Sequence, residues 1–237
     1  MPAFFVFHAA GGTMTPDELR ARILHRDPNI LVLDKPAGLP VHAGPAGRRS
    51  LEDLLGALTF GNREPPRLAH RLDTDTSGCL VLARHPKALS RLGRLFATGS
   101  VEKTYWAVVE GEPPAEEGTT DLPLSKRSDR TGWRMVPDRA GKPAVTQWRV
   151  LGRADGLSWL ELHPRTGRTH QIRVHCAASG FPILGDPVYG RPGDAMLHLQ
   201  ARAVRIPALS PSRPEVAVTA PPPPHMAARL RACGWAG

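Results

Sequence analysis

The chain has 237 residues, and its 31 Lys and Arg against 22 Asp and Glu give a formal net charge of +9. This length allows one large domain or two, and so large a positive excess suits a nucleic acid or an anionic membrane surface as partner. A hydrophobic content of 41% argues against global disorder, and no apolar run approaches the roughly 18 residues of a membrane-spanning helix.

The first half of the chain predicts short strands and helices joined by glycine- and proline-rich loops. A helix is expected from Thr15 to about His25, because Thr15 suits the N-cap and Pro16 the first helical position. Ser50 and Asp53 form a capping-box pattern at the start of a second helix. The expected elements are strands at 30–34 and 79–84, helices at 50–59 and 86–98, and a long loop at 35–49.

The second half reads mainly as strands. Residues 145–151 and 157–163 alternate apolar and polar side chains, and the Asp155-Gly156 pair between them is a hairpin-turn signal. Further elements are a strand at 101–110, a helix at 169–179 ended by Gly180, a strand at 196–206 and a helix after 220–224. The pattern predicts an α+β fold on a mostly antiparallel or mixed sheet.

One unusual stretch, RLAHRLDTDTSG at residues 67–78, packs charged and hydroxyl side chains directly before a buried strand. Polar loops that adjoin a strand end are a common place for catalytic groups, because the scaffold holds them rigidly. The alternative is a surface turn in which Asp73 or Asp75 caps local backbone groups. The pattern alone leaves both interpretations open.

A second stretch, TGRTHQIRVH at residues 166–175, predicts an anion site. Gly167 permits a tight turn, and Thr169 can cap the helix on which His170 and Arg173 share a face. A helix N-terminus that carries Arg168 and these two side chains attracts negative charge. The alternative is a solvated basic face.

Metal and nucleoside-triphosphate sites find little support. The spacing of His170 and His175 does not match HExxH, and Lys35-Pro36-Ala37-Gly38 lacks the spacing of a phosphate-binding Walker loop. The cysteines form neither a CxxC pair nor a disulfide framework, so the expected compartment is a reducing cytoplasm. The metal hypothesis would use His70, His163, His170 and His175 with Asp73, and the cysteines are Cys79, Cys176 and Cys233.

Six motifs in order resemble the RluA-type pseudouridine synthases. They are ILVLDKPAGLPVH, HRLDTDTSG, EKTYWAVVEG, GKPAVTQWRV, GRTHQIRVH and GFPILGDPVYG. The resemblance implies a catalytic domain at residues 23–223 around a mixed, mainly antiparallel sheet with flanking helices. Residues 1–22 would be a poorly ordered extension or a short helix, too short for the family's S4 RNA-binding domain. Residues 224–237 would form a tail or a short helix.

The resemblance further implies conversion of uridine to pseudouridine in structured RNA, tRNA and/or rRNA, with no cofactor or metal. Asp73 in HRLD is the implied catalytic residue. It would attack the ribose C1′, attack the base or deprotonate the sugar, and the sequence does not choose among these. A stacked uridine hides its glycosidic bond, so the base must first be flipped out.

Other site residues follow from the same resemblance. Arg173 would partner and orient Asp73, Tyr105 would lie against the target base, and Arg71 would fill the gap left by the flipped nucleotide. The RNA-binding residues expected are Arg71, His70, Arg168, His170 and Lys103. Basic residues expected to contact phosphates are Lys87, Arg91, Arg94, Lys126, Arg127, Arg130, Arg134 and Arg139. A monomer with RNA as its partner, without a membrane or an obligatory protein partner, is expected.

Two rival functions remain for comparison. One is a non-catalytic RNA-binding protein on the same scaffold, against which the presence of Asp73, Tyr105 and Arg173 argues. The other is a metal-dependent hydrolase that uses the histidines and Asp73.

Overall fold

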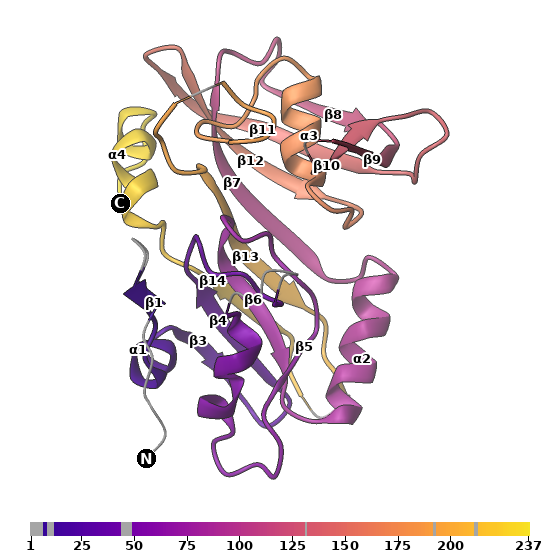
Figure 1. Cartoon of the computed structure of the whole chain (residues 1–237), viewed down its shortest axis with the longest axis vertical. Helices are drawn as coiled ribbons and strands as arrows, with labels where there is room; N and C mark the ends of the chain where they lie inside the picture. Colours follow the sequence, from indigo (N-terminus) through magenta and orange to yellow (C-terminus); the bar gives the residue numbers. More distant parts are fainter. Residues whose placement is uncertain (1–6, 9–11, 44–48, 131, 192, 211–212) are drawn as a thin grey trace. The chain divides into compact units, whose positions relative to one another are not determined.

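The computed structural model describes residues 7–8, 12–43, 49–130, 132–191, 193–210 and 213–237, which fold into two compact units (Figure 1). The first unit contains Met1–Glu102 and Ala201–Pro221, and the second contains Lys103–Gln200 and Pro222–Gly237. Each unit therefore combines two separate stretches of the chain. Both are built on antiparallel strand pairs with helices beside them, which confirms the α+β class.

The first unit is built around two apolar strands that the sequence predicts. Strand β6 (Ser77–Ala83) is buried along its whole length, and β4 (Ile30–Lys35) pairs with it antiparallel. Four further strands belong to this sheet. Strand β3 (Ile23–Arg26) pairs with β4, and β5 (Arg67–Leu68) pairs with β6. Strand β13 (Leu199–Ile206) lies beside β6 and pairs with β14 (Val216–Thr219).

Helices in the first unit follow their capping signals. Thr15 and Glu18 form a capping box at the start of α1 (Pro16–Ala21), but this helix is shorter than predicted because residues 23–26 pair with β4 as β3. Ser50 and Asp53 cap η1 (Leu51–Leu58), a 3-10 helix, as expected. Helix α2 (Pro86–Ala97) begins after the N-cap His85 and packs Ala88 and Leu92 against the sheet core.

The remaining short pair in this unit is β1 (Phe7–His8) with β2 (Gly12–Thr13). Helix α1 lies within the extension proposed for residues 1–22, of which 1–6 and 9–11 lie outside the described residues. The predicted loop at 35–49 carries no further helix or strand where it is described, and 44–48 lie outside that part.

The second unit contains a four-stranded antiparallel sheet in the order β7 (Glu102–Glu110), β12 (Leu157–Pro164), β11 (Val145–Ala154) and β8 (Glu117–Asp121). The predicted hairpin between β11 and β12 is confirmed, with Asp155 and Gly156 at φ of 53° and 71° in its turn. Helix α4 (Pro224–Ala232) packs Met226 and Leu230 against Trp159.

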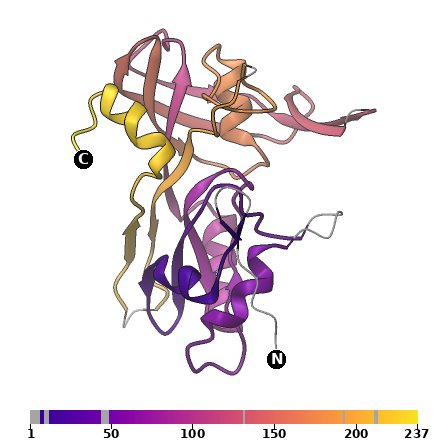
Figure 2. The same cartoon turned by 60° about the vertical axis from the view of Figure 1, so that its left-hand side comes forward.

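A second hairpin in this unit was not predicted from the sequence. Strands β9 (Leu124–Asp129) and β10 (Gly132–Pro137) pair antiparallel, and in Figure 2 they project from the rest of the second unit. Their outer residues are exposed on both faces, so the sequence there lacks the apolar alternation that predicts a half-buried strand.

The other helix of the second unit, α3 (Gln171–Ala178), begins two residues later than predicted. His170 is its N-cap and adopts the left-handed conformation, with φ 52° and ψ 18°. Thr169 is therefore not the capping residue. In the described part of the chain, no helix is long and apolar enough to cross a membrane.

Candidate active site

Asp73 lies on the loop between β5 and β6 in the first unit. The side chain of Asp73 is half-buried, whereas Leu72 before it and Thr76 after it are buried and anchor the loop. The Thr76 N–H donates to the Asp73 carbonyl oxygen at 3.2 Å, which closes a tight turn. Arg71 is exposed on the same loop. The loop thus carries a carboxylate and a guanidinium two residues apart in sequence on an anchored backbone.

A buried lysine ties this loop to the preceding one. The Lys35 ammonium donates to the carbonyl oxygens of Pro36, Leu39 and Thr74 at 2.8, 2.9 and 2.9 Å. The Thr74 carbonyl also accepts the Gly38 N–H at 2.9 Å. Three donors of one ammonium therefore meet three backbone acceptors, and one of these acceptors directly follows Asp73.

Two opposing effects act on the pKa of Lys35. Burial lowers the pKa of Lys35 to about 7, although the negative charges of Asp75, Asp73 and Asp34 act to raise it. Lys35 had no predicted role at the site, because a lysine in a Gly/Pro-rich loop carries no sign of burial.

His70 is largely engaged within the first unit. Its Nε2 accepts the Val81 N–H at 3.0 Å, and its ring stacks on Phe96 with centroids 4.6 Å apart. These contacts fix the start of the Asp73 loop against β6 and α2. They favour a role for His70 in holding the loop.

Tyr105 and Lys103 lie on β7 in the second unit. Tyr105 pairs with Leu162 of β12 and is half-buried against the apolar core of this unit. The Lys103 ammonium donates to the Thr166 carbonyl oxygen at 3.4 Å, and burial lowers the pKa of Lys103. Lys103 therefore contacts the turn that precedes α3.

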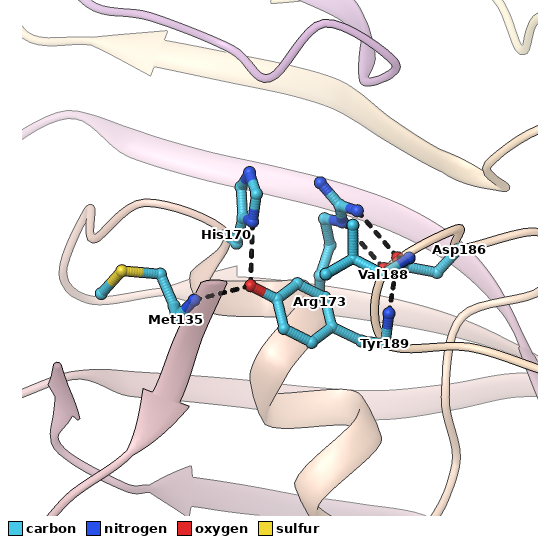
Figure 3. Close-up of polar contacts among 6 residues, drawn as sticks. All are labelled: Met135, His170, Arg173, Asp186, Val188 and Tyr189. Atoms are coloured by element: carbon cyan, nitrogen blue, oxygen red, sulfur yellow. Dashed lines mark hydrogen bonds and ion pairs between the residues drawn. The ribbon is translucent and has the colours of Figure 1, made fainter. Parts of the chain in front are cut away.

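Arg173 of α3 forms a buried, two-pronged ion pair with Asp186 (Figure 3). Burial disfavours the charged carboxylate of Asp186, but the hydrogen bonds and charge of Arg173 outweigh it and hold the pKa of Asp186 below its usual value. The same carboxylate accepts the N–H groups of Val188 and Tyr189 at 2.9 and 3.0 Å. Asp186 was missed, although it lies in the quoted motif GFPILGDPVYG.

Tyr189 contacts both β10 and the N-terminal part of α3 in the second unit (Figure 3). Its hydroxyl accepts the Met135 N–H at 2.9 Å and shares a hydrogen bond of 2.9 Å with Nδ1 of His170. The Arg173 guanidinium lies 5.3 Å from the Tyr189 ring centroid. His170 and Arg173 thus meet around this ring, although His170 precedes the helix on which the sequence placed it.

The turn before α3 is held by Gln171. Its Oε1 accepts the Thr166 hydroxyl at 2.6 Å and the Arg168 N–H at 3.0 Å, and its Nε2 donates to the Val145 carbonyl at 2.9 Å. The Arg168 side chain is exposed. A single buried amide therefore holds the turn that leads into α3, whereas the N-cap His170 makes no side-chain capping hydrogen bond.

The sequence-predicted residues fall into two groups. His70, Arg71 and Asp73 share one loop of the first unit, whereas Lys103, Tyr105, Arg168, His170 and Arg173 belong to the second. In the metal hypothesis, His175 is buried and bonded to Thr146 and to the Leu122 carbonyl oxygen. No group of three or more His, Cys, Asp or Glu within the described residues is arranged to hold a metal ion.

Solved structures resemble this fold over most of its length. The solved structure of human RNA pseudouridylate synthase domain containing 4 aligns with a TM-score of 0.76 and 32% sequence identity. The alignment covers 91% of this chain and 95% of the human chain. The solved structure of human RNA pseudouridylate synthase domain containing 1 aligns with a TM-score of 0.70 and 28% sequence identity. This alignment covers 84% of this chain and 82% of the human chain. The fold is thus that of a pseudouridylate synthase domain.

The RNA pseudouridylate synthase family model matches residues 29–178, and the chain belongs to this family of RNA-modifying isomerases. An RNA pseudouridine synthase of Zymomonas mobilis is 51% identical over 73% of this chain and 80% of its own length. The ribosomal large subunit pseudouridine synthase D of that organism is 39% identical over 74% of this chain and 58% of its own length. The RluA-type resemblance is thereby confirmed.

Proposed function

We propose that this chain isomerises uridine to pseudouridine in structured RNA, tRNA and/or rRNA, with Asp73 as the catalytic carboxylate. The observation that carries the proposal is the Asp73 loop. Its backbone is held by the buried Lys35 ammonium and by the Thr76 N–H, so the backbone from which the carboxylate projects has a defined position. Fixed geometry is what a nucleophile or base needs for a substrate that must first be flipped out.

The roles of the other residues belong to the same proposal. Arg71, exposed beside Asp73, fills the gap that the flipped nucleotide leaves. Tyr105 lies against the target base, and Arg173 orients the catalytic carboxylate. Arg168, His170, His70 and Lys103 bind or support RNA. The chain acts as a cytoplasmic monomer without an obligatory protein partner.

The test compares two carboxylates of one loop. Asp73→Asn is expected to abolish pseudouridine formation on total cellular RNA, with RNA affinity and the circular dichroism spectrum unchanged. Asp75→Asn is the matched control, because it removes the same charge two residues away and is expected to retain most turnover. Mass spectrometry of nucleoside digests measures the product. Near-normal turnover by Asp73→Asn would exclude that residue as the catalytic group.

A non-catalytic RNA-binding protein is the second candidate, favoured by the net charge of +9 alone. It predicts RNA binding by the wild-type protein without any pseudouridine, under conditions in which both variants bind equally well.

A further inference from the structure

A cationic cleft of about 560 Å³ lies in the second unit, at the base of the β9–β10 hairpin. Its walls come from the hairpin, from the loop before β11 and from the turn before α3. Three of its lining residues are the cations Lys126, Lys142 and Arg168, and none is acidic. Within the described residues, no carboxylate forms an ion pair with these three side chains.

Hydrogen bonds and close packing hold the backbone around this cleft in place. Leu124 and Lys142 exchange two backbone hydrogen bonds of 2.9 Å, and a Cβ on Gly141 would come within 2.5 Å of the Leu124 backbone. The Arg168 Nε–H donates to the Pro143 carbonyl oxygen at 3.0 Å, which fixes its guanidinium at the rim. An anion could therefore bind to the positive side chains of the cleft without a rearrangement of the backbone that carries them.

An exposed aromatic ring adjoins the cleft. Trp133 of β10 is 47% exposed, the largest exposed fraction among the large apolar side chains in the described part of the chain. The Lys126 ammonium, which also lines the cleft, lies 4.8 Å from the Trp133 ring centroid. The ring and the cationic cleft are therefore contiguous through one side chain.

The orientation of Trp133 is fixed by its contact with His170. Its ring stacks on His170 with centroids 5.2 Å apart and planes 26° from parallel. His170 is in turn hydrogen-bonded to Tyr189, whose hydroxyl accepts the Met135 N–H of the same hairpin. A rigid indole costs little conformational entropy when a partner stacks on it.

We propose that this cleft and Trp133 form a subsite for one unpaired nucleotide of the RNA substrate, which holds a phosphate among Lys126, Lys142 and Arg168. The base stacks on the exposed surface of Trp133. Lysine is a point charge on a flexible stem, so Lys126 can move from the ring to the phosphate as the base arrives. Aromatic stacking beside a positive groove is how proteins bind single-stranded RNA without reading its sequence. This subsite rests on the proposed function.

The test measures binding separately from chemistry, in the Asp73→Asn background. The probe is a fluorescein-labelled, unstructured RNA 12-mer of mixed sequence, followed by fluorescence anisotropy, and its partner probe has abasic sites at the central positions. Trp133→Ala is expected to weaken binding of the 12-mer about tenfold, and binding of the abasic probe less than twofold. Trp133→Phe is expected to restore most of the affinity.

The cationic half of the subsite has its own readout. Lys142→Gln is expected to make the slope of log affinity against log salt shallower by about 0.7, as for one lost phosphate contact. Arg229→Gln, which removes an exposed charge from α4 of the same unit, is the matched control and should leave this slope unchanged. This measurement stands even where Trp133→Ala fails to fold.

The outcomes separate the two proposals. Equal losses on the two probes, an unchanged affinity of Trp133→Ala, or no binding by the parent protein would overturn the subsite. If one of these results is found and the wild-type protein still forms pseudouridine, only the subsite is overturned and the proposed function stands. Discrimination between the probes without any pseudouridine formation overturns the function and supports the subsite.

Discussion

Arg173 and Asp186 form an ion pair sealed from solvent, with Nε to Oδ2 at 2.8 Å and Nη2 to Oδ1 at 2.7 Å, and side chains only 5% and 0% exposed. Parallel bonds from a planar guanidinium to one carboxylate fix the orientation of both groups. The pair also fixes the Val188–Tyr189 backbone, because Asp186 accepts both N–H groups. The residue proposed to orient Asp73 is therefore itself oriented by a carboxylate of its own unit.

Asp186→Asn is expected to lower the free energy of unfolding by about 3–5 kcal/mol, because it removes one partner of a buried pair. Urea denaturation measures the change. The matched control is Glu116→Gln, which breaks an ion pair with Arg153 in which the Glu116 side chain is 75% exposed. That change is expected to cost less than about 1 kcal/mol. Equal costs for the two variants would contradict the structural weight given to Asp186.

Lys35 predicts a pH dependence of stability. Its pKa is about 7 in the folded protein and 10.5 when unperturbed, so between these values the unfolded chain binds more protons. The free energy of unfolding therefore rises with pH in this window, by up to about 1.4 kcal/mol per pH unit. Below pH 7 both states are charged, and the full cost of burial is present.

Urea denaturation at several pH values between 6 and 10 measures this slope. Lys35→Met is expected to lose stability overall, because three carbonyls lose a donor, and to lose the slope that the lysine contributes. Lys142→Met, an exposed lysine, is expected to keep the wild-type slope. If the curves of the wild-type protein and Lys35→Met run parallel, Lys35 does not titrate in this range.

Gly78 ends the HRLDTDTSG motif where two backbones meet in the first unit. Its φ is +101°, and a Cβ there would lie 2.2 Å from the Ala201 carbonyl oxygen. Gly78→Ala is expected to destabilise the protein by roughly 3 kcal/mol or more, through strain and displacement of β13.

The comparison for Gly78 is Gly93, which lies inside α2. An added Cβ there would meet no atom of the described residues within 4 Å apart from the backbone of its own helix. Gly93→Ala is expected to stabilise by up to about 1 kcal/mol, because alanine favours the helix. Thermal melts of both variants decide the point. A Gly78→Ala protein that melts with the wild-type protein would show that β13 can move aside.

The elements that the sequence predicted correctly are those whose signals are local. The apolar runs at β4 and β6, the capping residues Thr15 and Ser50, and the Asp155-Gly156 turn each determine their own conformation. The β9–β10 hairpin was not predicted, because its exposed strands are stabilised by pairing with each other and by the contact of Met135 with Tyr189. That contact spans 54 positions in the sequence.

The candidate site shows the same division. The motifs located the Asp73 loop and the turn before α3, since clustered polar residues between apolar strands are visible in sequence. The buried partners Lys35 and Asp186 were not found. Their importance comes from burial and from acceptors or donors in three dimensions, which a single sequence does not display. The left-handed conformation of His170 was equally hidden, because a non-glycine residue at this position gives no local signal.

The discontinuous make-up of the first unit has a consequence for biosynthesis. Strand β6 lies beside β13, yet the β13 residues of this unit, from Ala201 onward, follow the whole intervening stretch Lys103–Gln200. At about 5–20 residues per second, a ribosome needs several seconds to supply them. Until then the nascent chain presents the apolar strand β6 without its β13 neighbour, and an unpaired strand edge is the kind of surface that recruits other chains. The emerging protein is therefore exposed to aggregation through this edge while residues Lys103–Gln200 are being translated.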